Sequence, residues 1–195
     1  MEKNLIYISG KEFLRKLLPP YEERDFSKIK LEEKFNLSGD KRFNELQDYL
    51  RREHARGLLK SNPISLREAQ IKGLKANNIF LPHLDGYGAS LEFVDFSNAY
   101  LLRFSFLEAC IADGNFNKAD LSEARLNSVG MRRTVFNETD FDKADFNKSF
   151  FWECDFRNAE NLEKVLNLRY AAFEKTKFND KERKMIELTG ADIVM

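Results

Sequence analysis

The sequence has little of several features that define common classes of protein. Its 195 residues include two cysteines, too few for the disulfide framework of a secreted domain. It has no apolar run of the about 18 residues that a membrane-spanning helix needs, and its first residues lack the apolar core of a signal peptide. Lysine plus arginine and aspartate plus glutamate both number 32, so net charge provides no attraction to nucleic acid or to an anionic membrane. These absences predict a cytoplasmic protein that neither enters a membrane nor binds nucleic acid directly.

Phenylalanine, in contrast, is abundant, with 18 copies, and its spacing is regular. In the stretch TDFDKADFNKSFFWECDF, residues 139–156, a phenylalanine returns at every fifth position. An α-helix turns about 100° per residue, so a step of five would scatter these rings around its axis. A β-strand alternates with a period of two, so an odd step would place successive rings on opposite faces. A chain that turns a corner once in five residues keeps the rings together.

The same frame runs from Leu66 to Phe156, which makes 19 units, and 17 of the 19 central residues are large and apolar. The two exceptions are Ala76 and Gly86. A second column of mostly small residues lies two positions before each centre, and the residue between the two columns is often polar. Each unit therefore predicts an in–out–in triplet followed by two turn residues. Four such units close a square coil, in which the small residues leave room for the large centres.

These units resemble the pentapeptide-repeat family, whose pattern is written A(D/N)LXX. The closest matches are ADLSE (119–123), TDFDK (139–143), ADFNK (144–148) and CDFRN (154–158). The resemblance implies an all-β solenoid, a right-handed quadrilateral β-helix. Nineteen units would make about 4.75 coils, and at the usual strand spacing the rod would be on the order of 23 Å long.

Both ends of a solenoid need covers, and the flanking sequences predict them. We expect a mainly helical N-terminal cap at 1–63, the β-helix at 64–158, and a C-terminal segment at 159–195 with shifted repeats and a capping helix. The predicted helices cover 11–18, a segment from Ser38 or Asp40 to about Leu59 with Phe43, Leu46 and Leu50 on one face, and a segment from Asn179 or Asp180 to Thr189-Gly190. Residues 26–37 are expected to be extended.

The residue types that usually carry catalysis are sparse and scattered. The only histidines are His54 and His83, expected on a helix and at a corner of the rod. Cys154 is expected to point inward and Cys110 outward. The S-x-x-K sequence at 38–41 is weak evidence without partner motifs. The sequence therefore predicts no catalytic, metal or cofactor site and no enzymatic activity.

Two exposed apolar surfaces are predicted as protein contacts. The first consists of outward residues on the face centred on 81 and 101, namely Phe80, Pro82, Tyr100 and Leu102. Residues 11–59 folding back, or a partner, would cover it. The second consists of Phe150 and Trp152 beside Arg132 and Arg133, a composition typical of interface hot spots. Residues 159–172, through Leu162, Val165, Leu166 and Tyr170, or a second subunit forming a homodimer would cover it.

A polar face is expected on the next side of the coil, where Asn117 and Asn137 are one coil apart in the frame. Amide side chains in register can form hydrogen bonds along a stack. If four units make one coil, these two residues lie next to each other.

The best functional prediction is a non-enzymatic structural scaffold or protein-binding module whose partner is unknown. The family resemblance implies an alternative, because members of the quinolone-resistance type are DNA-mimicking rods that bind DNA gyrase. A mimic of this length would need on the order of 13 negative charges. Residues 64–158 carry 14 acidic and 11 basic side chains, a net charge of −3. One acidic strip exists, consisting of Asp120, Glu123, Asp140 and Asp142, and Lys143 interrupts it.

Overall fold

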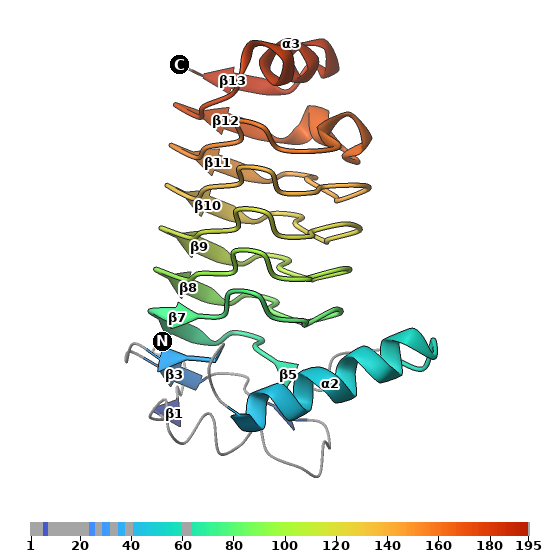
Figure 1. Ribbon diagram of the computed structural model, residues 1–195. Helices are drawn as coiled ribbons and strands as arrows, with labels where there is room; N and C mark the ends of the chain where they lie inside the picture. The colour runs from blue at the N-terminus through green and yellow to red at the C-terminus, as the bar shows by residue number, and fades with distance from the viewer. Residues whose placement is uncertain are drawn as a thin grey trace.

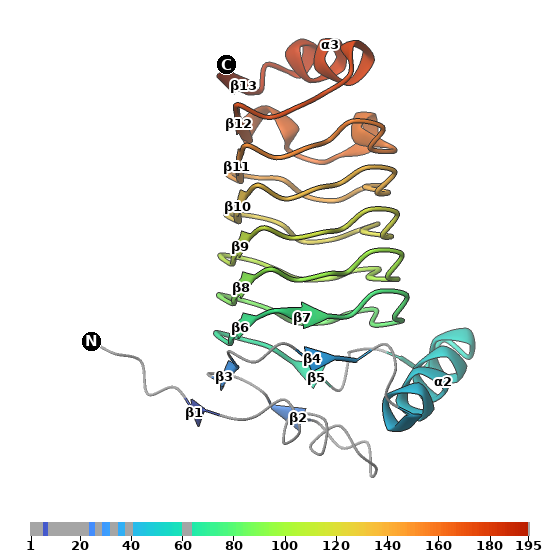
Figure 2. The ribbon, with the colours of Figure 1, turned by 60° about the vertical axis from the view of Figure 1, so that its left-hand side comes forward.

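The computed structural model describes residues 6–7, 24–25, 29–31, 35–37, 41–59 and 64–194. Within these residues, nine strands form one parallel sheet along a side of a rod of stacked coils (Figures 1 and 2). In spatial order they are β1 (Ile6–Tyr7), β3 (Ile29–Leu31), β6 (Gln70–Lys72), β8 (Ser90–Glu92), β9 (Cys110–Ala112), β10 (Gly130–Arg132), β11 (Phe150–Trp152), β12 (Ala172–Glu174) and β13 (Asp192–Val194). The predicted right-handed quadrilateral β-helix is confirmed.

The register confirms four units per coil. Cys110 pairs with Ser90 on one side and with Gly130 on the other, so one coil contains 20 residues. On the polar face, the backbone N–H of Asn137 donates a hydrogen bond to Asn117 Oδ1 at 3.0 Å, and Asn158 Nδ2 donates to Asn137 Oδ1 at 2.8 Å. Asn117 and Asn137 therefore lie next to each other, as four units per coil require, and a backbone-to-side-chain hydrogen bond links them.

The corners explain why aspartate so often precedes the central residue. The second turn residue has a positive φ in unit after unit, for example 59° at Lys118 and 54° at Glu138. The side chain before the centre accepts a hydrogen bond from the backbone N–H of the first turn residue, as Asp120 Oδ1 does from Ser122 at 2.9 Å. This is an Asx turn, which satisfies the turn's backbone and offsets the cost of the left-handed residue. Many of these aspartates are therefore structural.

Central phenylalanines from successive coils stack along the inside of the rod. The ring centroids of Phe96 and Phe116 are 5.3 Å apart, those of Phe116 and Phe136 are 5.6 Å apart, and those of Phe136 and Phe156 are 4.6 Å apart. Where the small column has a hydroxyl, it is satisfied by backbone: Thr139 Oγ1 donates to the carbonyl oxygen of Phe116 at 2.7 Å. The core is therefore apolar, close-packed and continuous along the stack.

The solenoid begins before the expected boundary at residue 64. Strands β2 (Arg24–Asp25) and β4 (Phe35–Asn36) pair with β5 (Ile64–Ser65) and β7 (Leu74–Lys75), and β3 pairs with β6, so three strands before residue 64 already belong to the stack. Helix α2 (Lys41–Ala55) follows and buries Phe43, Leu46 and Leu50, the three residues predicted on its inner face. The helix expected at 11–18 and the possible caps at 38–40 lie outside the described residues.

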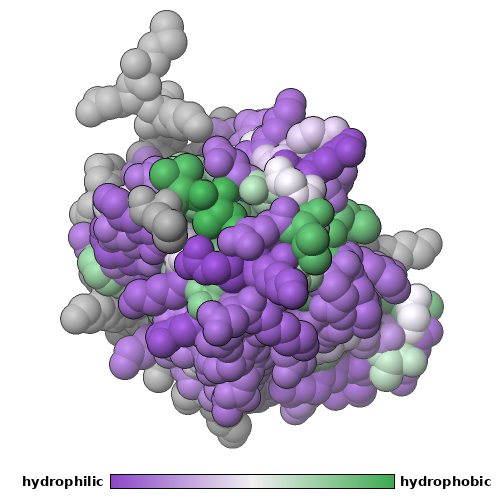
Figure 3. All heavy atoms as spheres, turned by 90° about the horizontal axis from the view of Figure 1, so that it is seen from above, coloured by the Kyte–Doolittle hydropathy of each residue, from purple (hydrophilic) through white to green (hydrophobic). Residues whose placement is uncertain are grey.

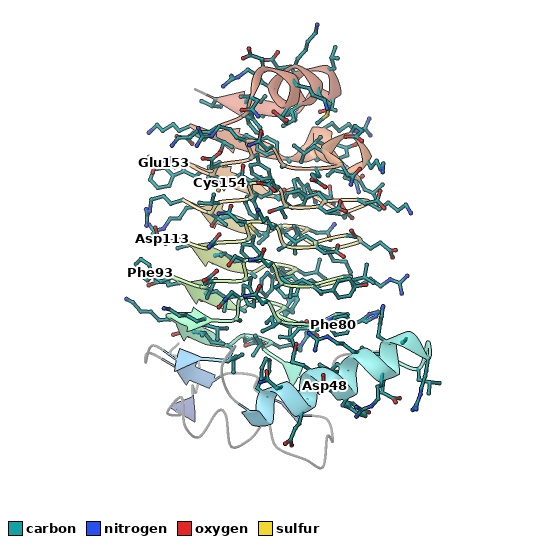
Figure 4. The ribbon with its side chains drawn as sticks, viewed as in Figure 1. Asp48, Phe80, Phe93, Asp113, Glu153 and Cys154 are labelled. Carbon is teal, nitrogen blue, oxygen red and sulfur yellow. The ribbon has the colours of Figure 1, made fainter. Side chains whose placement is uncertain are left out.

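Helix α2 lies beside the side of the rod that carries Phe80 (Figure 4). In the regular coils a backbone N–H at this position donates to the preceding coil, as Tyr100 does to the carbonyl oxygen of Ile79. For Phe80 the acceptor is Gln47 Oε1, from the buried face of α2. The helix therefore caps the sheet both with apolar side chains and with a hydrogen-bond acceptor.

The rod also continues beyond residue 158. Two short 3-10 helices, η1 (Leu162–Lys164) and η2 (Leu168–Tyr170), absorb two extra residues, because Phe150 pairs with Ala172 in the next coil. Helix α3 (Asp180–Thr189) covers the end and stops at Gly190, whose φ is 78°, as the sequence predicted. Seen from this end, the surface is mainly hydrophilic with separate hydrophobic patches (Figure 3). Within the described residues, neither α2 nor α3 has the length and apolar character needed to span a bilayer.

Candidate functional site: a groove on the long sheet

The first predicted contact surface packs against α2. The rings of Phe80 and Tyr100 stack at 4.6 Å, and the His54 ring meets both edge-on at 5.5 and 5.7 Å. The Tyr100 hydroxyl lies 3.4 Å from His54 Nε2, and burial raises the pKa of the Tyr100 phenol. Pro82 is buried and Leu102 is half-buried. Helix α2 therefore covers much of the first predicted contact surface, for which the sequence had allowed either the N-terminal segment or a partner as the cover.

The partly buried His83, next to Pro82 on this surface, predicts an acid-sensitive stability. Burial lowers the pKa of His83 below its usual 6.5, and the charges of Arg103 and His54 lower it further against the opposing effect of Glu123. The unfolded chain therefore binds a proton more readily than the folded chain. The stabilising contribution is complete above the unfolded value of 6.5 and is lost as the pH falls through the lower folded value.

Urea unfolding curves recorded at steps from neutral pH to about pH 5, above the range where ordinary carboxylates titrate, should show the midpoint falling. We expect His83→Gln to flatten this dependence. A variant with the same slope as the wild type would show that another group carries it.

The acidic strip is electrically compensated. Arg103 Nε lies 2.7 Å from Glu123 Oε2, and Lys164 Nζ lies 3.3 Å from Asp142 Oδ1. Asp120 and Asp140 each accept the backbone N–H of their own corner at 2.9 Å. The strip is therefore a series of turns and ion pairs rather than a line of free charge.

The second predicted surface lies on the outer face of strands β8 to β11 and forms a groove of about 370 Å³. Ser90, Cys110 and Gly130 are neighbours in register and make a floor of small side chains. A Cβ added to Gly130 would find only Cys110 Sγ, at 4.0 Å, so the floor is open. Phe150 and Trp152 on the next strand line the groove at its C-terminal side. The hollow exists because three small residues in a column lie beside a pair of large aromatic ones.

Residues 159–172 do not cover Phe150 and Trp152 in the way that the sequence predicted. Leu162 and Val165 are buried in the core, because the segment after residue 158 completes another coil and its apolar side chains fill the interior. Leu166 and Tyr170 remain 50% and 52% exposed. Phe150 is 43% exposed, and Trp152 is half-buried with Lys175 Nζ 5.7 Å from its ring centroid.

The two predicted arginines have different surroundings. Arg133 makes two hydrogen bonds of 2.7 Å to the carboxylate of Asp113, which holds the pKa of Asp113 below its usual value. Arg132 lines the groove, and its neighbours in register are Ala112 and Trp152. Within residues 41–59 and 64–194, no ion pair links the Arg132 guanidinium to a carboxylate. Within that part of the chain Arg132 is therefore a groove cation without an ion pair, although its charge adds to that of Arg133 in lowering the pKa of Asp113, and Arg133 stabilises the neighbouring corner.

The two cysteines differ as expected from their positions. Cys110 is exposed on the groove floor. Cys154 is buried, and burial raises the pKa of its thiol to about 12. Cys110 is therefore the cysteine that a water-soluble thiol reagent can reach, and it reports whether the groove is occupied.

Sequence reasoning missed Phe93 at the edge of this sheet. It is 54% exposed with a φ of 53°, an unfavourable conformation for a bulky residue, and Lys72 Nζ lies 5.4 Å from its ring centroid. Phe93 follows the same edge as Asp113 and Glu153 (Figure 4). The available signal was an aromatic residue at the second turn position, which is polar in most units.

The groove offers aromatic faces, the Arg132 guanidinium and small side chains, which suit non-covalent recognition. Among the residues that the structure describes, no three His, Cys, Asp or Glu side chains are grouped so that they could hold a metal ion. The groove also lies on regular strands, whose rigidity presents the same surface to every ligand.

Comparisons with known proteins agree on the repeat. The sequence profile for pentapeptide repeats matches residues 115–152 and 134–180, with eight copies. A sequence comparison with curated proteins finds no significant match.

Several solved structures are similar at low identity. The pentapeptide repeat protein Rfr23 from the cyanobacterium Cyanothece 51142 is 13% identical with a TM-score of 0.36, over 54% of this chain and 63% of that one. HetL, involved in heterocyst differentiation regulation in Nostoc sp. strain PCC 7120, is 18% identical with a TM-score of 0.35, over 87% and 68%. A trypsin-treated form of QnrB1, a plasmid-mediated fluoroquinolone resistance protein, is 14% identical with a TM-score of 0.34, over 90% and 84%.

Proposed function

We propose that the chain, which matches the pentapeptide-repeat profile over residues 115–152 and 134–180, is a non-enzymatic cytoplasmic scaffold that binds another protein through the groove on β8 to β11. A rigid solenoid presents a preformed surface, so little conformational entropy is lost when a partner binds. The fold thus suits recognition, and the groove supplies both apolar rings and a cation that a partner can contact.

The observation that carries this proposal is an exposed phenylalanine and a half-buried tryptophan beside an arginine that has no ion pair within residues 41–59 and 64–194. Phe150 is 43% exposed, and Arg132 has Trp152 rather than a carboxylate as its neighbour. Tryptophan and arginine are the residues most enriched among those that dominate binding energy at interfaces. Covering this surface would remove aromatic area from water and give the guanidinium a partner.

Site-specific crosslinking tests the proposal. A photoreactive benzoylphenylalanine is placed at Phe150 in the full chain and, in a matched control, at Arg125. Both positions precede the centre of their unit and both are exposed, but Arg125 lies on another side of the rod.

We expect one defined adduct with another polypeptide from position 150 alone. The adduct should disappear when Trp152 is changed to alanine, and the purified partner should bind the full chain in solution. Equal adducts from both positions, or none from position 150, would contradict a binding groove.

The DNA-mimicking alternative, a protein that binds DNA gyrase, comes second. A mimic needs a line of uncompensated negative charge, whereas Glu123 and Asp142 each lie beside a cation. A supercoiling assay with purified gyrase separates the two proposals. Inhibition by the wild type that is lost in Glu123→Gln and Asp142→Asn would favour the mimic.

A further inference from the structure

We infer that the groove recognises an acidic aromatic segment of the partner protein, with a carboxylate on Arg132 and an apolar ring against Phe150 and Trp152. This inference rests on the proposed function and specifies the partner's chemistry. It follows from the charges around the groove, from the shape of its floor and from its openness.

The requirement for a carboxylate comes from the acids already present. Glu92 lines the groove, but Lys72 Nζ lies 3.4 Å from its Oε2. Asp113 is held at the corner by two hydrogen bonds from Arg133. These two acids are thus each paired with another cation. A carboxylate from a partner can accept two parallel hydrogen bonds from the Arg132 guanidinium. The Trp152 indole beside it lowers the local polarity.

The requirement for an apolar ring comes from the floor. Ser90, Cys110 and Gly130 present little side chain, so an incoming ring can lie low against the sheet. It would then meet Phe150 and Trp152, which lie above the end of this column. Aromatic pairs in offset or edge-on contact gain energy beyond the area that they bury.

A segment of another protein fits this groove better than a small molecule or a second copy of the chain does. A small molecule usually has most of its surface enclosed, whereas here Cys110 and Phe150 are both exposed. A second copy related by a two-fold axis through the groove would add the same residues to the interface, so it would bring a second Arg132 and a second Glu92 that Lys72 already pairs. A segment of another protein meets neither objection.

Peptides displayed on phage provide the probe. Random short peptides are selected against the full-chain protein, and enriched sequences are synthesised and titrated. Trp152 is the only tryptophan, so its fluorescence reports on the groove. Reaction of Cys110 with a maleimide provides a second readout, since the thiol of Cys154 is buried.

We expect the enriched peptides to carry aspartate or glutamate near an aromatic residue, to change Trp152 fluorescence and to protect Cys110. Arg132→Glu should weaken their binding by about tenfold, in line with the loss of one charge-assisted contact. The matched variant Arg125→Glu, with the same charge change on another side, should bind as the wild type does. Replacing the peptide's acid with lysine should restore binding to Arg132→Glu.

The contrary results are distinct. Binders that protect Cys110 but lack acidic residues would overturn the inference while leaving the proposed function intact, because the groove would still hold a polypeptide. Binders that leave Cys110 reactive would overturn both, because they would use another surface. A library without binders, together with a dimer that Trp152→Ala converts to a monomer in sedimentation, would assign the groove to a second copy and overturn both.

Discussion

Phe136→Ala is expected to lower the free energy of unfolding by about 3–5 kcal/mol, the usual cost of removing a buried phenylalanine. The Phe136 side chain is fully buried, and its ring lies between those of Phe116 and Phe156 in the stack, with centroids 5.6 and 4.6 Å away. Phe141 lies 5.4 Å away within the same coil. The neighbours are held by their own strands and cannot close the cavity, so the loss should lie near the upper end of this range.

Guanidinium unfolding followed by circular dichroism measures this loss. Val135→Ala is the matched control, because Val135 precedes the same centre but points outward and is half-buried. Its cost should stay below about 1 kcal/mol. Equal losses in the two variants would mean that the in–out register of this unit has been assigned incorrectly.

Regular repetition explains how much of the fold could be predicted. A five-residue frame fixes which side chains point inward, and Leu66 to Phe156 obeys it without interruption. The frame could not reveal the strands before β5, because α2 occupies the chain between β4 and β5. Nor could it carry through η1 and η2, where Asn161 and Asn167 adopt left-handed conformations that accommodate the two extra residues.

The candidate site was predictable in part for the same reason. Phe150 and Trp152 flank the central residue of their unit, and this position predicted that both side chains point outward. The groove depends instead on residues 20 positions apart, since Ser90, Cys110 and Gly130 become neighbours only when the coils stack. Ion pairs follow the same spacing, as between Arg103 and Glu123. Such contacts can be derived from a sequence once the coil length is known, but side-chain size alone does not show that a hollow forms.

Gly86→Leu, which restores the usual central residue of the repeat, is expected to destabilise the protein by about 3 kcal/mol, the upper part of the range for overpacking a core. Gly86 departs from the pattern because the Phe106 ring of the next coil occupies the space of the missing side chain. A Cβ at Gly86 would overlap the Phe106 ring, which cannot move away because the Phe104 ring centroid lies 3.8 Å from its own.

A double-mutant cycle tests this explanation. Phe106→Ala alone should cost about 3–5 kcal/mol through the cavity that it leaves, and Gly86→Leu in the same chain should fill part of that cavity. The double variant should then be more stable than Phe106→Ala, with a favourable coupling of about 3 kcal/mol. Gly130→Ala is the control glycine, because an added Cβ there meets only Cys110 Sγ at 4.0 Å, and it should change stability by less than about 1 kcal/mol. Additive losses at Gly86 and Phe106 would show that the two residues do not share one space, and the departure at Gly86 would then need a different cause.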